Sequence, residues 1–224
     1  MLFTDADYIV MESTYGDKDH GPQDAVAREL ADIINSTRRA GGNLVIPVFA
    51  VERTQELLYH LSSLLAEDLI PNLAVFVDSP MAAKVTDVFN HHSELFDDET
   101  KLLIKDGIKP CDFPGLVMTR TVEESKAINN IKGTVIIMAG SGMCNAGRIK
   151  HHLAANISRP ESTILFVGYQ AVGTLGRVIL DGAKQVRIFG QIRQVEARVA
   201  RINGFSAHAG KSELLKWLSA LKRP

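Results

Sequence analysis

Four polar residues stand directly after the first short apolar run of the chain, at residues 8–11. They are Glu12, Ser13, Thr14 and Tyr15. In an open α/β sheet, ligands bind outside the carboxyl ends of the strands, so a polar turn in this place favours a functional site. A carboxylate there can accept a proton or orient a histidine, and the hydroxyl groups can contact phosphate or sugar. An ordinary polar turn between a strand and a helix is the alternative.

A glycine-rich segment at residues 140–148 follows a later apolar run and precedes a helical pattern. Glycines allow successive N–H groups to converge on an anion, and the start of a helix adds partial positive charge. Within the segment, Ser141, Gly142 and Arg148 are the candidates for binding phosphate. The segment matches neither the P-loop nor the dinucleotide fingerprint, so it predicts no nucleotide cofactor. A purely structural glycine turn is the alternative.

His208 lies between small residues just before the last helical pattern, which leaves room for a ligand. Its imidazole could donate a proton to a leaving oxygen, whereas a helix cap or a packed side chain is the alternative. The adjacent pairs His91/His92 and His151/His152 are weaker candidates, because neighbours on a helix diverge by about 100° and cannot both face one metal. No histidine-rich metal motif occurs, so no metal ligand is predicted in this chain.

Three further loops each follow a predicted strand and carry a side chain suited to an anion. These side chains are Arg53, Ser79 and Thr174. If the sheet is parallel, the carboxyl ends of all its strands meet at one edge. We therefore expect these three residues and Arg148 to form an anion-binding rim. The carboxylate at position 12 and the imidazole at position 208 are the titratable pair suited to acid–base chemistry there.

Short apolar runs rich in Val and Ile alternate with longer amphipathic segments, and this alternation predicts the elements that position these loops. Buried strands are expected at residues 8–11, 44–48, 74–77, 134–138 and 163–167, and helices at residues 24–40, 52–65, 81–90, 97–105 and 211–221. The apolar runs lack a polar alternation, which is typical of a parallel sheet covered by helices on both faces. Alternation around Gly190 predicts a hairpin or meander. The predicted fold class is α/β with a mostly parallel sheet.

The composition of the 224-residue chain, 46% hydrophobic and 23% charged, excludes disorder and allows a sizeable core. No apolar run approaches the roughly 20 residues of a membrane span, so no membrane partner is expected. Cys111 and Cys144 form no paired motif, which excludes a cysteine zinc site and fits a cytoplasmic location.

Charge is divided unevenly between the two halves of the chain. Residues 1–112 hold 9 Lys and Arg against 20 Asp and Glu, a net charge of −11, whereas residues 113–224 hold 16 against 6, a net charge of +10. The basic half could present a positive face to a polyanion such as a nucleic acid. The alternative is that the two halves neutralise each other in the fold.

Taken together, the motifs resemble those of the β-CASP family of metallo-β-lactamase-fold nucleases. Residues 11–16 resemble motif A of the family and residues 205–208 resemble motif B, with residues 46–50, 140–143 and 168–170 between them in the expected order. The resemblance implies a β-CASP domain at residues 16–182. Residues 1–15 would be a strand and motif A from a metallo-β-lactamase domain, and residues 183–224 would return to that domain with motif B.

The same resemblance implies a zinc-dependent ribonuclease of RNA processing or decay. His208 would protonate the leaving oxygen and Glu12 would hold its imidazole. The zinc ligands of the family lie mainly in an N-terminal domain whose histidine signature is absent here, so this chain is expected to be inactive alone. Phosphate contacts are assigned to Ser13, Thr14, Tyr15, Arg53, Ser79, Ser141, Gly142, Arg148, Thr174 and Ser206.

The implied partners are single-stranded RNA and the N-terminal metallo-β-lactamase domain, with a homodimer left open. RNA rather than DNA rests on the resemblance alone, because the family also has DNA-processing members. The sequence shows no obvious aromatic platform, and Trp217 is interpreted as a packing residue, so phosphate-led binding is expected. Two alternatives stay open: a non-catalytic RNA-binding paralogue, and an unrelated phosphate-binding α/β module.

Overall fold

The computed structural model describes residues 5–19, 23–205 and 208–221. Within them, the central sheet has six strands, and every neighbouring pair is parallel. The strands lie in the order β3 (Leu116–Met118), β2 (Ala74–Asp78), β4 (Val135–Ala139), β1 (Leu44–Pro47), β5 (Thr163–Phe166) and β8 (Arg198–Arg201). The predicted α/β class is confirmed.

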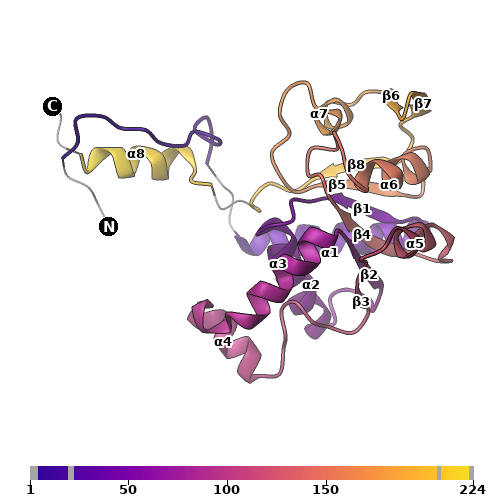
Figure 1. The fold of residues 1–224 in the computed structure, drawn as a ribbon, viewed down its shortest axis with the longest axis horizontal. Helices are drawn as coiled ribbons and strands as arrows, with labels where there is room; N and C mark the ends of the chain where they lie inside the picture. Colours follow the sequence, from indigo (N-terminus) through magenta and orange to yellow (C-terminus); the bar gives the residue numbers. More distant parts are fainter. Residues whose placement is uncertain (1–4, 20–22, 206–207, 222–224) are drawn as a thin grey trace.

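Helices cover both faces of this sheet (Figure 1). One face is covered by α1 (Gln23–Ala40), α2 (Arg53–Ala66) and α3 (Pro80–His91), and the other by α6 (Ile149–Asn156) and α7 (Leu175–Leu180). None of the helices in the described part of the chain has the length and apolar character needed to cross a membrane.

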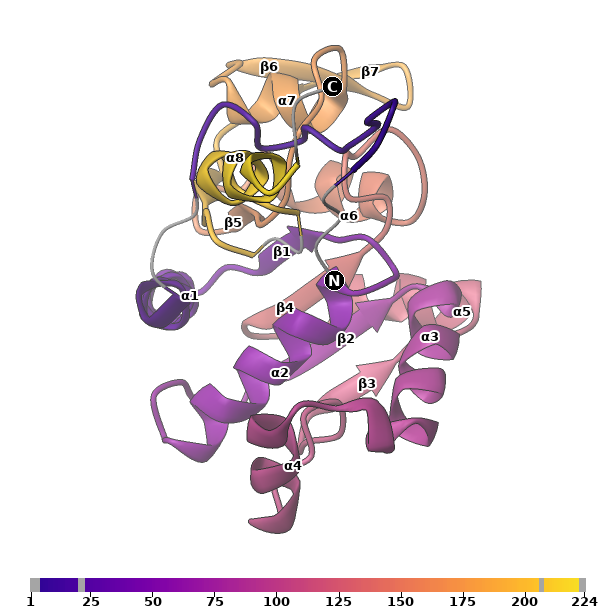
Figure 2. The same cartoon turned by 90° about the vertical axis from the view of Figure 1, so that its left-hand side faces the viewer.

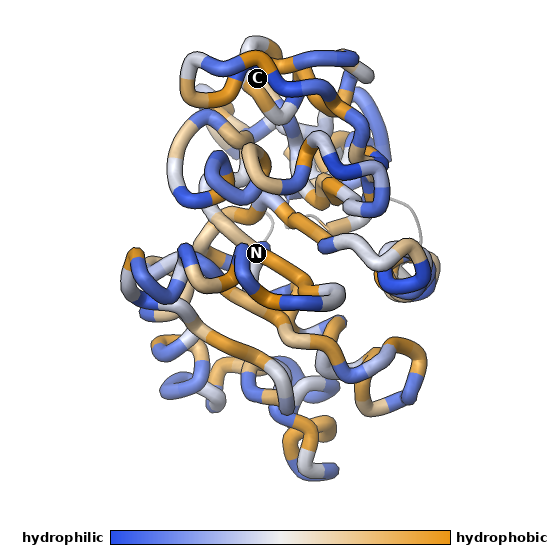
Figure 3. Tube along the Cα trace, turned by 90° about the vertical axis from the view of Figure 1, so that its right-hand side faces the viewer, coloured by the Kyte–Doolittle hydropathy of each residue, from blue (hydrophilic) through white to orange (hydrophobic). Residues whose placement is uncertain are grey.

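The core is divided into two clusters because successive residues of a strand point to opposite faces. On one face Leu44 clusters with Leu30 and Leu58, and on the other face Val45 clusters with Leu153. Every residue of β1 and β4 is buried, which explains why their sequences show no polar alternation. In Figure 3 the strands at the centre of the molecule are accordingly coloured as hydrophobic.

The remaining elements are short or lie beside the sheet. A hairpin of β6 (Gln185–Ile188) and β7 (Gln191–Gln194) turns at Phe189 and Gly190, whose φ angles of 50° and 78° suit a type I′ turn. This hairpin was predicted, but β8 joins the edge of the parallel sheet rather than extending a meander. The remaining helices are η1 (Ser93–Leu95), α4 (Asp98–Lys105), α5 (Val122–Ala127), η2 (Ile128–Asn130) and α8 (Lys211–Ser219).

The prediction of a strand at residues 8–11 was wrong. Tyr8 and Val10 are 91% and 97% exposed, and the segment pairs with no strand of the described chain. Without a neighbouring strand or a core to cover, its apolar side chains cannot form a buried strand. Residues 5–19 instead run beside α8, at one side of the sheet (Figures 1 and 2), and one isolated parallel bridge joins Tyr15 to Gly210.

Sequence and structure also differ at the edges of the sheet. Strand β3 and helix α5 were not predicted, because three and six residues are too short to show a period. Strand β8 lies in the segment assigned to the return toward a second domain, yet it pairs with β5. The proposed division at residues 15/16 and 182/183 stays a prediction.

Candidate functional site

Glu12 and His208, which are 196 positions apart in the sequence, are brought into direct contact. Glu12 Oε2 lies 2.5 Å from His208 Nδ1, and Glu12 Oε1 accepts a hydrogen bond of 2.9 Å from the N–H of Ala209. The two segments that carry them are held together by a further hydrogen bond, in which the N–H of Lys211 donates to the carbonyl oxygen of Lys18 at 2.9 Å. The expected carboxylate–imidazole pair is therefore formed in the fold.

The electrostatics of this pair define the tautomer of the histidine. The hydrogen bond from the backbone N–H of Ala209 lowers the pKa of Glu12. Desolvation opposes this shift and His208 adds to it, so the carboxyl is ionised at neutral pH. An ionised carboxylate can only accept, so Nδ1 of His208 carries the hydrogen that lies between the two residues. Nε2 is then the ring nitrogen that Glu12 does not engage, and a proton can be exchanged with a ligand there.

The pair lies in a pocket of about 610 Å³ at the carboxyl edge of the sheet. The pocket is lined by the turn at residues 12–15 and by loops that follow three parallel strands, which confirms that these loops gather at one edge. The lining residues are Glu12, Ser13, Thr14, Tyr15, Phe49, Val51, Glu52, Arg53, Met143, Gly168, Tyr169 and His208. Of the predicted site residues, it thus contains Glu12, Ser13, Thr14, Tyr15, Arg53 and His208.

Aromatic rings form part of this pocket, contrary to the expectation of no aromatic platform. Phe49 and Tyr169 are 43% and 40% exposed there, and Tyr169 makes an edge-to-face contact with buried Tyr15 at 6.3 Å between centroids. Phe49 packs closely over Gly142, where a Cβ atom would lie 2.7 Å from the ring. The sequence signal was present, because both exposed rings come two or three residues after a buried strand.

Arg53 is the arginine of this pocket, and its position is fixed by α2. Its guanidinium forms an ion pair with Glu56 one turn further along the helix and lies 5.9 Å from the centroid of the Phe205 ring. Burial raises the pKa of Glu56 although Arg53 opposes the shift. The cation is thus held by its own helix at the edge of the pocket.

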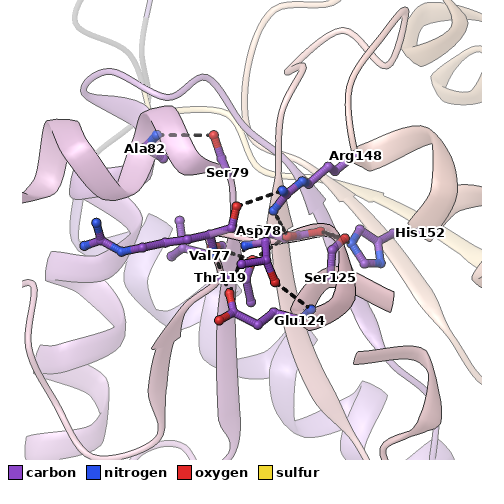
Figure 4. Close-up of polar contacts among 11 residues, drawn as sticks. Val77, Asp78, Ser79, Ala82, Thr119, Glu124, Ser125, Arg148 and His152 are labelled. Carbon is purple, nitrogen blue, oxygen red and sulfur yellow. Dashed lines mark hydrogen bonds and ion pairs between the residues drawn. The ribbon is translucent and has the colours of Figure 1, made fainter. Parts of the chain in front are cut away.

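Arg148 belongs to a different, buried site that the sequence did not reveal (Figure 4). Its Nη1 donates to Oδ1 of Asp78 at 2.7 Å, and its Nη2 donates to the carbonyl oxygen of Arg120 at 3.1 Å. Asp78 is fully buried and also accepts from Nε2 of His152 at 2.7 Å. Further donors to Asp78 are Ser125 Oγ at 2.5 Å and the hydroxyl of Thr119.

Burial alone would raise the pKa of Asp78, but these hydrogen bonds outweigh it and hold the pKa far below its ordinary value. The carboxylate is therefore charged and satisfied in the interior. The sequence shows Asp78 at the end of an apolar run, but its four hydrogen-bond partners come from three other parts of the chain. Sequence spacing gives no indication that they meet.

The other predicted phosphate-binding residues have local partners. Ser79 accepts from the N–H of Ala82 at the start of α3, and Thr174 accepts from the N–H of Arg177 at the start of α7. Ser141 bonds with the backbone of Ala146 inside its own loop. These residues, with Gly142 and Arg148, do not line the 610 Å³ pocket, and Ser206 lies outside the described residues. Phosphate binding by them stays a prediction.

A zinc ion would need a group of ligands that this part of the chain does not supply. Among the described residues, no three His, Cys, Asp or Glu side chains gather as a metal ion requires. Glu12 and His208 offer two donors, and the atoms Oε2 and Nδ1 are engaged with each other. The donor set of these residues alone therefore does not fit a zinc site.

The fold and the site define a parallel α/β domain that holds an ionised carboxylate against an imidazole in a pocket at the carboxyl edge of its sheet. Comparison with known families makes the assignment specific. The Beta-Casp domain model matches residues 54–179, and the model of the Zn-dependent metallo-hydrolase RNA specificity domain matches residues 193–224. The chain belongs to the β-CASP family, as its motifs predicted.

Characterised relatives extend this similarity over nearly the whole chain. It is 39% identical over 218 residues to Ribonuclease TTHA0252 of Thermus thermophilus, covering 97% of this chain and 50% of that protein. It is 30% identical over 229 residues to the Transcription termination factor FttA of Methanosarcina mazei, covering 98% of this chain and 36% of that protein. The chain thus spans a third to a half of the length of the relatives it matches.

Proposed function

We propose that this chain is the RNA-binding and acid–base half of a zinc-dependent ribonuclease that hydrolyses phosphodiester bonds in RNA processing or decay. The observation that carries the proposal is the contact between Glu12 and His208 inside a pocket of ligand size. Membership of the β-CASP family and similarity to a protein named as a ribonuclease support RNA as the substrate. In this proposal, zinc is held mainly by residues outside this chain, in a metallo-β-lactamase domain.

His208 acts as the general acid for the leaving oxygen of the cleaved bond. Since Nδ1 faces Glu12, the proton is delivered from Nε2, and Glu12 keeps the ring in this tautomer and orientation. Glu12 therefore acts as a positioning residue and His208 as the residue that contacts the reacting atoms.

The remaining walls of the pocket suit a single strand of RNA. The exposed faces of Phe49 and Tyr169 can stack with bases of any identity, and Ser13 and Thr14 supply hydroxyl groups for phosphate oxygens. Arg53, which is ion-paired with Glu56, presents a guanidinium at the same edge. Stacking and phosphate contacts do not read base edges, so we expect binding with little sequence preference.

The proposal is tested with the purified 224-residue chain and a 5′-labelled single-stranded RNA. Fluorescence anisotropy measures RNA binding, gel analysis with and without added zinc measures cleavage, and native mass spectrometry counts bound zinc. We expect RNA binding without cleavage and without stoichiometric zinc. Zinc-dependent cleavage by this chain would show that it holds its own metal site. Binding of mononucleotides with no gain for longer RNA would favour an unrelated phosphate-binding module.

A further inference from the structure

A second, smaller pocket adjoins the acid–base pocket. It has a volume of about 210 Å³ and shares Tyr15 and Gly168 with the larger pocket, so the two lie on either side of the same wall. It sits between the carboxyl ends of β5 and β8, because Arg201 ends β8 and pairs in register with Phe166 at the end of β5. Lys18, Asp19, Arg201 and Gly204 also line it.

Two half-buried cations line this pocket. Lys18 Nζ lies 5.0 Å from the centroid of the Tyr15 ring, which holds the ammonium group by a cation–π contact. Arg201 contributes the second cation from the edge strand. Neither forms an ion pair with a carboxylate among residues 5–19, 23–205 and 208–221, so both charges are available to an external anion.

One carboxylate also lines the pocket, and it is engaged elsewhere. Asp19 accepts hydrogen bonds from the N–H and the hydroxyl of Ser212 at 2.7 and 2.8 Å, at the first turn of α8. With its charge counted, the pocket carries a net charge of +1. The acid–base pocket has the opposite character, since Glu12 and Glu52 line it and its arginine, Arg53, is paired with Glu56.

RNA that places one phosphate beside Glu12 and His208 carries a neighbouring phosphate to one side of it, and positive charge there can bind that phosphate. The small pocket supplies this positive charge, across the wall formed by Tyr15 and Gly168. We infer that Lys18 and Arg201 bind an RNA phosphate next to the one at the acid–base pair. This inference rests on the proposed function and adds a binding site to it, whose ligand is either a terminal 5′-phosphate or an internal phosphodiester.

The test is the salt dependence of RNA binding to the 224-residue chain. The variants are Lys18→Met, Arg201→Met and their combination, with Arg201→Lys as the charge-conserving control. Lys132→Met is the matched control, because Lys132 is an exposed cation just before β4, at the amino edge of the sheet. Each phosphate contact on a single strand contributes about 0.7 to the slope of log K against log salt.

We expect the double variant to reduce that slope by about 0.7, the contribution of one phosphate contact, and each single Met variant by at most that amount, with Arg201→Lys and Lys132→Met unchanged. RNA with a 5′-phosphate and RNA with a 5′-hydroxyl distinguish the two sources. A reduced slope with the 5′-phosphorylated RNA alone assigns the pocket to the terminal phosphate. A reduced slope with both RNAs assigns it to an internal phosphate. Unchanged slopes in the double variant would overturn the inference while leaving the RNA-binding function intact.

A second readout separates failure of this inference from failure of the proposed function. Inorganic phosphate is titrated into the ¹⁵N-labelled chain, and the amide signals of Gly168 and Gly204, which line the pocket, are followed by NMR. Shifts in the wild type that vanish in the double variant support an anion site even if the chain binds no RNA. No shift, together with no change in slope, rejects the site.

Discussion

Replacing Asp78 with Asn tests whether the buried polar cluster holds the domain together. Asn keeps the shape of the side chain but removes its charge and turns one acceptor into a donor. In the wild type, Asp78 is fully buried and accepts hydrogen bonds from Arg148 and His152, both at 2.7 Å. After the substitution, the guanidinium of Arg148 has lost its counter-ion, and the amide N–H₂ group faces hydrogen-bond donors.

The expected loss follows from the burial of the partners. A hydrogen bond to a charged group contributes about 1.5–3 kcal/mol, and removal of one partner from a buried ion pair costs about 3–5 kcal/mol. The side chain of Arg148 is 21% exposed while that of His152 is not exposed, so solvent can compensate for the first but not the second. We therefore expect Asp78→Asn to lower the free energy of unfolding by about 3–5 kcal/mol.

Urea unfolding at pH 7 measures this loss, with Asp87→Asn as the matched control. Asp87 also forms an ion pair with an arginine, Arg120, at 3.2 Å, but the two side chains are 55% and 59% exposed. An exposed pair contributes about 0–1 kcal/mol, so the control should change little. A loss below about 1 kcal/mol for Asp78→Asn, equal to that of the control, would refute the reasoning.

The pH dependence gives a second check on the same residue. Because the pKa of Asp78 is lower in the folded chain than in the unfolded chain, ionisation stabilises the fold above the unfolded pKa of about 3.9. That stabilisation is lost as the pH falls through and below this value. The difference in stability between the wild type and Asp78→Asn should therefore be constant near neutrality and shrink below about pH 4.

Three further outcomes are expected. In the longer ribonuclease proposed above, Glu12→Gln should lower kcat by about 10²- to 10⁴-fold with KM nearly unchanged, and an equal loss of RNA affinity would contradict the acid–base assignment. Gly142→Ala should cost about 1–3 kcal/mol in urea unfolding and weaken RNA binding, because the new Cβ would lie 2.7 Å from the Phe49 ring; an unchanged stability would show that the ring moves freely. Burial raises the pKa of Cys111 to about 11 and of Cys144 to about 12. Iodoacetamide at pH 8 should therefore label neither thiol in the native chain and both in urea, as measured by intact mass. Labelling of the native chain would contradict the burial of the two thiols.

Much of the fold could be predicted because its strands are buried on both faces. Runs such as residues 134–138 must be apolar at every position when helices cover the sheet on both sides, and this leaves a clear signal. The same signal failed at residues 8–11, where an apolar run has no partner strand in the described chain. Composition shows what a segment can bury, but not whether anything lies there to cover it.

The sequence predicted some parts of the site and not others. Loops at the carboxyl edge follow from a parallel sheet, so their convergence on one pocket could be expected from the strands alone. The choice of Glu12 and His208 as the acid–base pair followed from this convergence. Their direct contact was implied by the resemblance of two motifs, since no local rule brings together residues 196 positions apart. The partners of Asp78 have neither signal, because each hydrogen bond to it spans 41 to 74 positions.

The cluster around Asp78 and the pocket are connected through the loop between β4 and α6. At its far end the loop is anchored by the ion pair of Arg148 with Asp78. Near its start, the carbonyl oxygen of Gly142 accepts from Nε2 of Gln170 at 2.9 Å, and that of Met143 accepts from the N–H of Gly176 at 3.1 Å. Gly142 in turn supports the Phe49 ring that faces the pocket. Since the loop is fixed at both ends, binding of the base that we propose to stack on Phe49 would leave little conformational entropy to lose.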